Sequence, residues 1–429
     1  MTDQNLLNDF LAIHPLVRDR FPQAEDDGCG NRRIHLNCAA GTLVVDTAAA
    51  AMAESALYSN PLPGDQYPAE IATRELHHEL RSLVADFLHA PSSDEVSFHL
   101  STTNALFNLA FSLRSVLKKG DNLIITDLDH MANISPWETV WGEWQNLEIR
   151  RARIDPKGFL DLEHLLSLVD RKTRLVAVTM ASNGFGSVVP LRELTALVKE
   201  KSPGCLVCTD AVHHALHRPI DVQDIGCDFL AFSGYKLFGP MTGVLWGKLD
   251  LLEQLSPYRV ATNKNKPPGK FEQGTLNNPV LASLKAALEY LIWLAGETAG
   301  REHQFRDRRA AFLLAMKAIA AYESELTHII LKGFQDFDPS RVRLFGPADP
   351  QSQSFRHPTF LFEVEGRSAA DVKALLWRNA GIQIADGNHY SAAVYRHLKK
   401  PSLCRASLAH YNTVREAQIF LESLERLTT

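Results

Sequence analysis

The stretch TDAVHHALHRPIDVQDIGCDFLAFSGYKLFGP (209–240) decides the fold of this 429-residue chain. Asp210 ends one apolar, β-prone segment, and Lys236 follows the next one, in a turn rich in glycine and proline. In an open parallel sheet, ligands bind in the crevice outside the carboxyl ends of the strands. If both segments are parallel strands, the two side chains face one crevice.

Two kinds of segment alternate around this stretch. One kind is a short, continuous apolar run, and the other has apolar residues at helical spacing. Their alternation predicts an α/β fold with a mostly parallel sheet that helices cover on both faces. The expected strands are 95–100, 122–127, 148–154, 174–182, 205–211, 228–234 and 243–248, and the expected helices between them include 104–117, 162–170 and 191–201.

The C-terminal part of the chain predicts a smaller region of helices and strands. RVATNKNKPPGKFEQGT (259–275) is rich in lysine, asparagine, proline and glycine, which is typical of a long loop. The apolar stretch after it predicts a helix that continues past residue 300. In the smaller region we expect strands at 360–364 and 404–411 and helices at 367–380 and 414–428.

The expected division of the chain follows from these elements. Residues 1–34, which look helical, form an N-terminal segment that packs on the small domain. Residues 35–290 form a large ligand-binding domain, and residues 291–429 form the small domain.

Composition excludes several classes of protein. Hydrophobic residues make up 45% of the chain and charged residues 22%, as in globular proteins, so disorder and coiled coil are excluded. A formal net charge of -5 gives no reason to expect a nucleic-acid or membrane partner. No apolar run reaches the roughly 18 residues that span a bilayer, and MTDQNLLNDF lacks the features of a signal peptide. We therefore expect a cytoplasmic protein.

The six cysteines do not form a disulfide or metal framework in the sequence. Cys205 and Cys208 form a CxxC pair, but no second cysteine or histidine pair stands at zinc-finger spacing. Their apolar surroundings predict structural burial, as for Cys227, and no metal site is expected.

Lys236 and Asp210 together suit one cofactor. A lysine in an apolar setting can form a Schiff base with a carbonyl. An aspartate at the neighbouring strand end can keep a pyridinium nitrogen protonated, and these two groups are what pyridoxal 5'-phosphate (PLP) needs. Taken singly, each residue is better explained in the ordinary way, as a surface lysine or a helix-capping aspartate, and the pair gains weight only from the residues that accompany it.

Three further groups follow strand ends, each with a functional and a structural interpretation. Hydroxyls in STTNALFNLA (101–110) begin a helix, where they could bind phosphate or merely cap the helix. His130 in DLDHMANISPW could stack on a flat ring or lie on the surface. The Asn183 amide in MASNGFG could reach a cofactor oxygen or simply serve the turn before a glycine.

Five ordered blocks make the chain similar to a known family. It resembles the fold-type-I PLP enzymes of the class V aminotransferase group, most of all the cysteine desulfurase and selenocysteine lyase branch. The resemblance implies a large domain with a seven-stranded, mostly parallel sheet and a smaller α+β domain built from both termini. The blocks are STTNALFNLA, DLDHMANISPW, TRLVAVTMASNGFG, residues 210–240 with GVLWG, and FEQGTLN followed late by CRASLAHYNT.

The resemblance also implies residue roles. Lys236 would hold the cofactor and move a proton at the substrate's α-carbon, Asp210 would pair with the ring nitrogen, and His130 would stack on the ring. Asn183 and His213, where the family usually has glutamine, would lie near the phenolic oxygen. Arg405 would bind the substrate's α-carboxylate. The phosphate would be held by Thr102, Thr103, Ser233 and Tyr235, the last where the family often has histidine.

One segment implies a homodimer. Gly274 and Thr275 match the part of the family that reaches the phosphate of the other subunit's cofactor.

The largest departure from the family lies in IQIADGNHYSAAVYRH (382–397). Desulfurases use a mobile cysteine in this loop to attack the substrate's sulfur, whereas here the loop has no cysteine and Tyr390 stands in its place. Ala385 replaces the basic residue often found before the loop. The segment is closer to desulfurase-like proteins that lack the nucleophile. His389, with Asn183, is a candidate for substrate binding, and Tyr390 for proton donation.

The sequence leaves several reactions open for an amino-acid substrate. β-Elimination from cysteine or an S-substituted cysteine is the first hypothesis, because it needs no sulfur from the enzyme. Transamination, epimerisation or oxidative decarboxylation or deamination of another amino acid is the alternative. A non-catalytic scaffold on the same fold would have no need of Lys236.

Overall fold

The computed structural model describes residues 3–59, 61–263 and 265–428. A seven-stranded sheet forms its centre, with strand order β2-β8-β7-β6-β5-β3-β4. β8 is antiparallel to both of its neighbours, and the pairs from β7 to β4 are parallel. All seven strands expected in the large domain are confirmed: β2 (Val96–His99), β3 (Asn122–Thr126), β4 (Glu148–Ala152), β5 (Thr173–Thr179), β6 (Leu206–Asp210), β7 (Phe229–Ser233) and β8 (Gly243–Gly247).

Side chains that alternate along each strand build two hydrophobic layers. On β3, Leu123 and Ile125 pack with α4 residues on one face, whereas Ile124 joins the core on the other face. α7 contributes Leu194 and Val198 to that second core. Both faces are therefore covered, which explains why the strands are apolar throughout. The covering and connecting helices include α4 (Thr102–Ser112), α5 (Ser135–Trp137), α6 (Leu162–Leu168), α7 (Leu191–Lys201), α8 (Val222–Ile225) and α9 (Leu249–Gln254).

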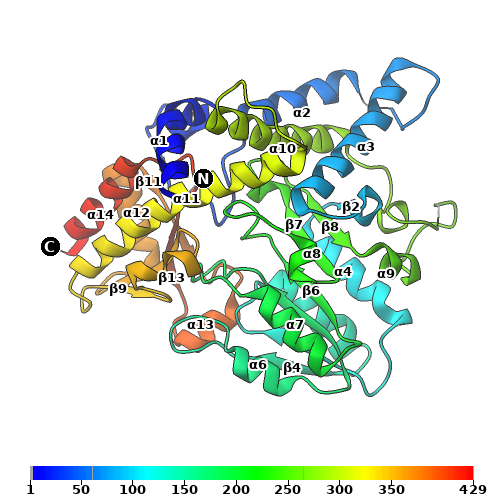
Figure 1. Cartoon of the computed structure of the whole chain (residues 1–429). Helices are drawn as coiled ribbons and strands as arrows, with labels where there is room; N and C mark the ends of the chain where they lie inside the picture. Colours follow the sequence, from blue (N-terminus) through cyan, green and yellow to red (C-terminus); the bar gives the residue numbers. More distant parts are fainter. Residues whose placement is uncertain (1–2, 60, 264, 429) are drawn as a thin grey trace.

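A group of long helices lies over one end of the sheet (Figure 1). α10 (Asn278–Ala299) packs against α2 (Asp46–Tyr58), α3 (Pro68–Leu88) and α11 (Arg308–Asp336). α10 is long and apolar enough to cross a membrane, yet 56% of its most apolar window is buried inside the protein. It is a core helix of this fold, and the expected boundary at 290/291 falls inside it.

The expectation that this helix continues past residue 300 is wrong. α10 ends at Ala299, because the next residue, Gly300, has a φ of 86°, which suits glycine but not a helical residue. α11 then begins after Asp307, whose side chain accepts a hydrogen bond from the Ala310 backbone N–H.

The smaller region contains a four-stranded antiparallel sheet, β12-β13-β10-β9. The predicted strand 404–411 ends at Ser407, because the backbone N–H of Leu408 turns to the Pro358 carbonyl. The elements are β9 (Val342–Phe345), β10 (Thr359–Val364), β12 (Ala385–Gly387), β13 (Leu403–Ser407), α12 (Ala369–Ala380), α13 (Ala392–Leu398) and α14 (Val414–Thr428).

The N-terminal segment joins this region. α1 (Asp3–Asp19) packs along α11, and Arg18 forms a 2.6 Å ion pair with Glu416 of α14. β1 (Ile34–His35) pairs in parallel with β11 (Ile382–Gln383). α1 and α14 thus lie on the same side of the molecule (Figure 1).

Candidate active site

Two adjoining cavities lie at the carboxyl ends of the parallel strands. The inner one, of about 160 Å³, is bordered by the last residues of β5, β6 and β7. The outer one, of about 890 Å³, opens beside it and reaches the small region. Nine residues predicted from the sequence line the inner cavity together: Thr102, Thr103, His130, Asn183, Asp210, His213, Ser233, Tyr235 and Lys236.

Lys236 provides a buried amine without a fixed partner. It follows β7 in a short 3₁₀ turn and is only 4% exposed. Within the described part of the chain, its Nζ has no hydrogen bond or ion pair. Burial, helped by the Arg405 charge, lowers the pKa of Lys236 to about 8. Such an amine is neutral more often than an exposed lysine and is free to react with a carbonyl.

Asp210 provides a buried carboxylate at the end of β6. Its Oδ1 accepts a 2.8 Å hydrogen bond from the Val212 backbone N–H. Burial raises the pKa of Asp210 to about 6, which reflects a carboxylate that lacks a bonded cation. A protonated ring nitrogen placed in this cavity would compensate it.

The phosphate candidates gather at the N-terminus of α4. The Thr102 hydroxyl donates to the Phe232 carbonyl at 2.8 Å and lies 2.6 Å from the Ser233 hydroxyl. β8 approaches this helix end so closely that a Cβ on Gly243 would collide with the backbone of Ser101. The helix end offers backbone N–H groups and a favourable dipole to an anion.

His130 borders both cavities. Its Nδ1 accepts a 3.0 Å hydrogen bond from the Ala132 backbone N–H, which fixes the ring at the start of a 3₁₀ turn. Burial, together with the Lys236 charge, lowers the pKa of His130 to about 4, so the ring is neutral and suited to stacking. The preceding residue, Asp129, is fully buried, and burial raises its pKa to about 8. Asp129 was not among the residues predicted from the sequence, although it stands beside a candidate residue.

The hydrogen bonding of His213 indicates whether the cavity fits PLP. The ring is buried, lines the inner cavity, and bonds through Nε2 to the Thr359 hydroxyl at 3.0 Å. Its Nδ1 is a buried polar atom without a protein partner. Buried polar atoms are nearly always paired, so this atom points to a ligand with a polar group. The unpaired Lys236 amine, the Asp210 carboxylate and the α4 terminus fit the other functional groups of PLP.

Arg405 and Asn183 connect the cavities to the small region. Arg405 on β13 is fully buried, donates through Nη1 to the Asn183 carbonyl at 3.0 Å, and leaves Nε unpaired. No carboxylate forms an ion pair with Arg405 among the residues described. Burial lowers the pKa of Arg405 to about 10, as expected for a desolvated cation that lacks its counter-ion. A substrate carboxylate could provide that charge.

The loop after β12 is tied to the large sheet. The Asn183 side chain donates to the His389 carbonyl at 2.9 Å and accepts from the Ser391 hydroxyl at 2.6 Å. The Met131 backbone N–H donates to the Tyr390 carbonyl at 2.8 Å. His389 and Tyr390 both have positive φ, of 53° and 54°. The ties hold these two residues at the outer cavity.

Two side chains of this loop have different surroundings. His389 bonds through Nδ1 to the Tyr395 hydroxyl, and its Nε2 is unpaired. Tyr390 is 72% exposed, and its ring centroid lies 5.6 Å from that of His130. Ser391, Tyr395 and Met131 had no signal in the sequence, because only the folded chain brings them here.

Thr275 lies apart from the Lys236 cavity. It lines a separate pocket with Leu100, Met241 and Tyr258. Its predicted contact with a cofactor therefore needs a second copy of the chain.

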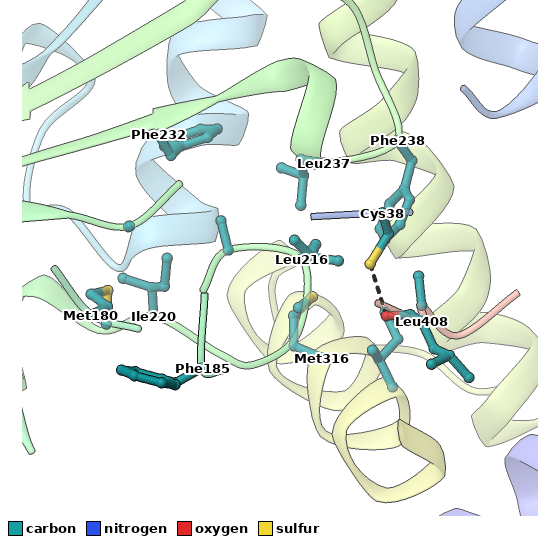
Figure 2. Close-up of a cluster of buried hydrophobic side chains, with 14 of the residues drawn as sticks. Cys38, Met180, Phe185, Leu216, Ile220, Phe232, Leu237, Phe238, Met316 and Leu408 are labelled. Carbon is teal, nitrogen blue, oxygen red and sulfur yellow. Dashed lines mark hydrogen bonds between the residues drawn. The ribbon is translucent and has the colours of Figure 1, made fainter. Parts of the chain in front are cut away.

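The cysteines confirm the structural interpretation of the CxxC pair. Cys205 and Cys208 are buried free thiols on and beside β6. No group of three or more potential metal-binding histidine, cysteine or acidic side chains occurs in the described ranges. Cys38 lies nearer the site, but its Sγ donates to the Leu408 carbonyl within a hydrophobic cluster (Figure 2), and burial raises its pKa to about 12.

No cysteine is found among the described residues that line either cavity. Cys404 adjoins Arg405 in sequence, but its thiol points to the Ala369 carbonyl, and burial raises its pKa to about 12. Cys29 is exposed in the N-terminal segment.

Comparisons with known proteins agree with this geometry. The family model described as Aminotransferase class-V matches residues 34–313 and 309–420. The chain is 35% identical over 362 residues to a cysteine desulfurase of Pectobacterium atrosepticum, with 81% of each chain covered. It is 34% identical over 370 residues to a cysteine desulfurase of Serratia proteamaculans, with 83% of each covered.

Solved structures share the fold over nearly the whole chain. The apo cysteine desulfurase of Thermococcus onnurineus NA1 has a TM-score of 0.82 and 25% identity and covers 96% of this chain and 98% of its own. A C-DES mutant with glycine covalently linked to the PLP cofactor has a TM-score of 0.75 and covers 95% and 98%; at 18% identity it supports the fold alone. With a family model and relatives that span most of its length, the chain belongs to the aminotransferase class-V family and is a PLP-dependent enzyme of the cysteine desulfurase-like kind.

Proposed function

We propose that this enzyme is a C–S lyase that catalyses β-elimination from cysteine or an S-substituted cysteine. The observation that carries the proposal is the outer cavity: among the described residues, its lining includes a buried arginine whose Nε is unpaired, but no cysteine. Relatives that are 33–35% identical carry the name cysteine desulfurase, which favours a cysteine-type substrate.

The residues of the two cavities divide the work between substrate and cofactor. The Arg405 guanidinium binds the α-carboxylate and so places the α-carbon near Lys236. PLP, when bound, accepts the electron pair of the α C–H bond into its ring. Asp210 keeps the ring nitrogen protonated, and the Lys236 amine takes the proton from the α-carbon. Its lowered pKa suits both removal and return of a proton near neutral pH.

The sulfur leaves with its own substituent. Without a thiol on the enzyme to attack it, the substrate's Cβ–S bond breaks, sulfur takes the electron pair, and a proton makes the thiol. Cysteine and water then give hydrogen sulfide, pyruvate and ammonia, and an S-substituted cysteine gives the corresponding thiol. The outer cavity is large enough for a substituent on sulfur, since ligand sites commonly enclose about 300–1,000 Å³.

Product analysis tests the proposal. The PLP-loaded protein is incubated with cysteine and with S-alkyl cysteines, and pyruvate, ammonia, thiol and alanine are measured. We expect pyruvate and thiol in equal amounts. Alanine with a sulfur atom added to a protein cysteine would instead show a desulfurase, and an amino group transferred to the cofactor without thiol would show transamination.

Cys29 supplies the matched control, because it is the exposed one of the six cysteines. Cys29→Ser should leave pyruvate formation unchanged. A loss of turnover in this variant would contradict a mechanism that uses no enzyme thiol.

Tyr390 is proposed as a proton donor to the departing sulfur. Its exposed ring at the rim of the outer cavity, beside His130, can reach a group that leaves from the substrate. Tyr390→Phe should lower kcat about 10- to 100-fold for cysteine, whose leaving group is basic. The loss should be smaller for S-aryl cysteines, whose thiolates leave without a proton. Equal turnover by the variant and the wild type would remove Tyr390 from the mechanism.

We also propose a homodimer that completes each site. Thr275 cannot serve the cofactor of its own chain, because it lines a separate pocket. Beside it, Leu100 and Met241 are 84% and 82% exposed, an unusual state for large apolar side chains. Light scattering should give twice the chain mass, and Leu100→Glu with Met241→Glu should weaken both the dimer and PLP binding. A monomer with full PLP affinity would contradict this assembly.

A further inference from the structure

A buried hydrogen bond links the large sheet to the small sheet beside the inner cavity. His213 follows β6, and Thr359 is the first residue of β10. The His213 Nε2 lies 3.0 Å from the Thr359 hydroxyl oxygen, and both residues are buried. The bond is therefore shielded from water.

The bonding of the hydroxyl decides where its proton points. The Thr359 hydroxyl has no other partner in the described part of the chain. If it accepted a proton from Nε2, its own hydrogen would be buried without an acceptor, which is costly. Donation from the hydroxyl to a bare Nε2 satisfies both atoms. A neutral imidazole then carries its one proton on Nδ1.

The groups around His213 keep it neutral. His217 meets its ring edge-on with a centroid distance of 5.2 Å, and His357 does so at 5.9 Å. Burial, with the charges of Lys236, His217, Arg405 and His214, lowers the pKa of His213 well below its usual value. Glu323, the acidic group of this cluster, is bonded to His217 at 2.7 Å and not to His213.

We propose that Thr359 is a positioning residue that fixes His213 in the Nδ1–H tautomer, so that Nδ1 donates a hydrogen bond to the cofactor's ring oxygen. Nδ1 is the unpaired atom of a ring that lines the inner cavity. The inference rests on PLP binding and not on the proposed elimination. If the proposal holds, a residue of the small sheet, Thr359, influences the acidity of the cofactor that the large sheet binds.

The hydrogen bond from His213 Nδ1 should change how readily the bound cofactor loses a proton. A donor to the ring oxygen stabilises its anion and weakens the hold of that oxygen on the proton it shares with the Lys236 nitrogen. The pH at which the visible absorption band changes reports this proton. Loss of the donor should raise that pH midpoint.

Two variants at position 359 test the proposal without any substrate. Thr359→Val keeps the shape and removes the hydroxyl, and Thr359→Ser keeps the hydroxyl. We expect the spectral midpoint to rise by about half a pH unit in the valine variant and to stay in place in the serine variant. His213→Leu, which removes the donor entirely, should shift it in the same direction by about one unit. An unchanged midpoint in Thr359→Val would overturn the proposal.

A second background separates tautomer control from packing. His213→Gln supplies an amide donor that has no tautomer to fix. Thr359→Val should then leave the midpoint of the His213→Gln protein unchanged. An equal shift in both backgrounds would show that residue 359 acts through packing, which would contradict a role through His213.

Nitrogen-15 NMR of histidine-labelled protein without PLP gives a direct answer, with the His213 signals identified by their absence in His213→Gln. We expect the wild type to show a protonated Nδ1 and a bare Nε2, and Thr359→Val to show a mixture. A protonated Nε2 in the wild type would overturn the proposal. If the valine variant folds poorly, as judged by circular dichroism, Thr359→Ala takes its place.

Discussion

Replacing Lys236 with alanine is expected to abolish covalent attachment of PLP and to lower turnover by about 10³-fold or more. Lys236 is the one lysine among the described residues that line the two cavities. Its amine is buried and unpaired, and its pKa is lowered to about 8 by burial, so no second group can both hold the cofactor and move a proton at the α-carbon. The expected loss is therefore at least as large as for any other residue of the site.

Mass spectrometry after borohydride reduction measures the attachment directly. Wild-type protein prepared with excess PLP should carry the added mass on the peptide that contains Lys236, and its visible band near ~420 nm should be absent from the variant. Modification of another lysine in the wild type would contradict the assignment, as would a variant that keeps the band.

Lys270 is the matched control, because it is also buried, with 2% exposure. Its Nζ donates to the carbonyls of Glu253 and Leu255 at 2.9 and 2.8 Å, so its bonds are structural. Lys270→Ala should lower thermal stability, because it leaves these carbonyls unpaired, yet keep the visible band. The two substitutions thus separate loss of a buried lysine from loss of the reactive one.

The central sheet could be predicted because its strands are buried on both faces and are therefore apolar throughout. The site could be predicted for a related reason: Thr102, His130, Asp210 and Lys236 all follow or end such strands, so the edge of the sheet places them together. The end of a strand can be recognised from the residues next to it, so these positions could be predicted from the sequence.

Other parts of the site depend on contacts between distant segments. Thr359 meets His213, and Asn183 meets Ser391, only when the small sheet packs on the large one. No local pattern marks such pairs. The break between α10 and α11 had a signal in the sequence that was not used: the polar stretch GREHQFRDRR (300–309) interrupts the apolar pattern, and the backbone conformation of Gly300 ends the helix.

The environment of Cys38 also could not be predicted from the sequence. The sequence could not say whether a cysteine near the site is reactive. The structure places Cys38 in the hydrophobic cluster of Figure 2, where its thiol is bonded and its pKa is raised by burial. A buried thiol of this kind is a poor nucleophile, because the thiolate is the reactive form.

Asp210→Asn should raise the stability of the PLP-free protein but lower the activity of the PLP-loaded enzyme. In the wild type without PLP, burial raises the pKa of Asp210 from 3.8 to about 6, so the carboxylate destabilises the folded state. A shift of about two units corresponds to about 3 kcal/mol, and the amide should recover part of it at pH 7–8. With PLP the same change should lower kcat by about 10³-fold and weaken cofactor binding, because an amide cannot keep the ring nitrogen protonated.

The stability difference between the wild type and Asp210→Asn should depend on pH. Above pH 6 Asp210 is ionised in both folded and unfolded protein, so the full cost is present. As the pH falls through 6 towards 3.8, the folded state binds a proton before the unfolded state does, and the cost disappears. Urea unfolding of PLP-free protein should therefore show the variant more stable at pH 8, with the difference shrinking towards pH 5.

Asp129→Asn is the control for this argument. Asp129 is equally buried, but its pKa is raised by burial to about 8, so it is mostly protonated at neutral pH. An asparagine there resembles the acid already present, and its carbonyl can still accept the 2.6 Å hydrogen bond from the Asn133 side chain. PLP affinity and the visible band should persist in Asp129→Asn and fail in Asp210→Asn. If both variants bound PLP equally well, or if Asp210→Asn were less stable than the wild type at pH 8, the buried carboxylate of Asp210 would not be the group that holds the cofactor's ring nitrogen.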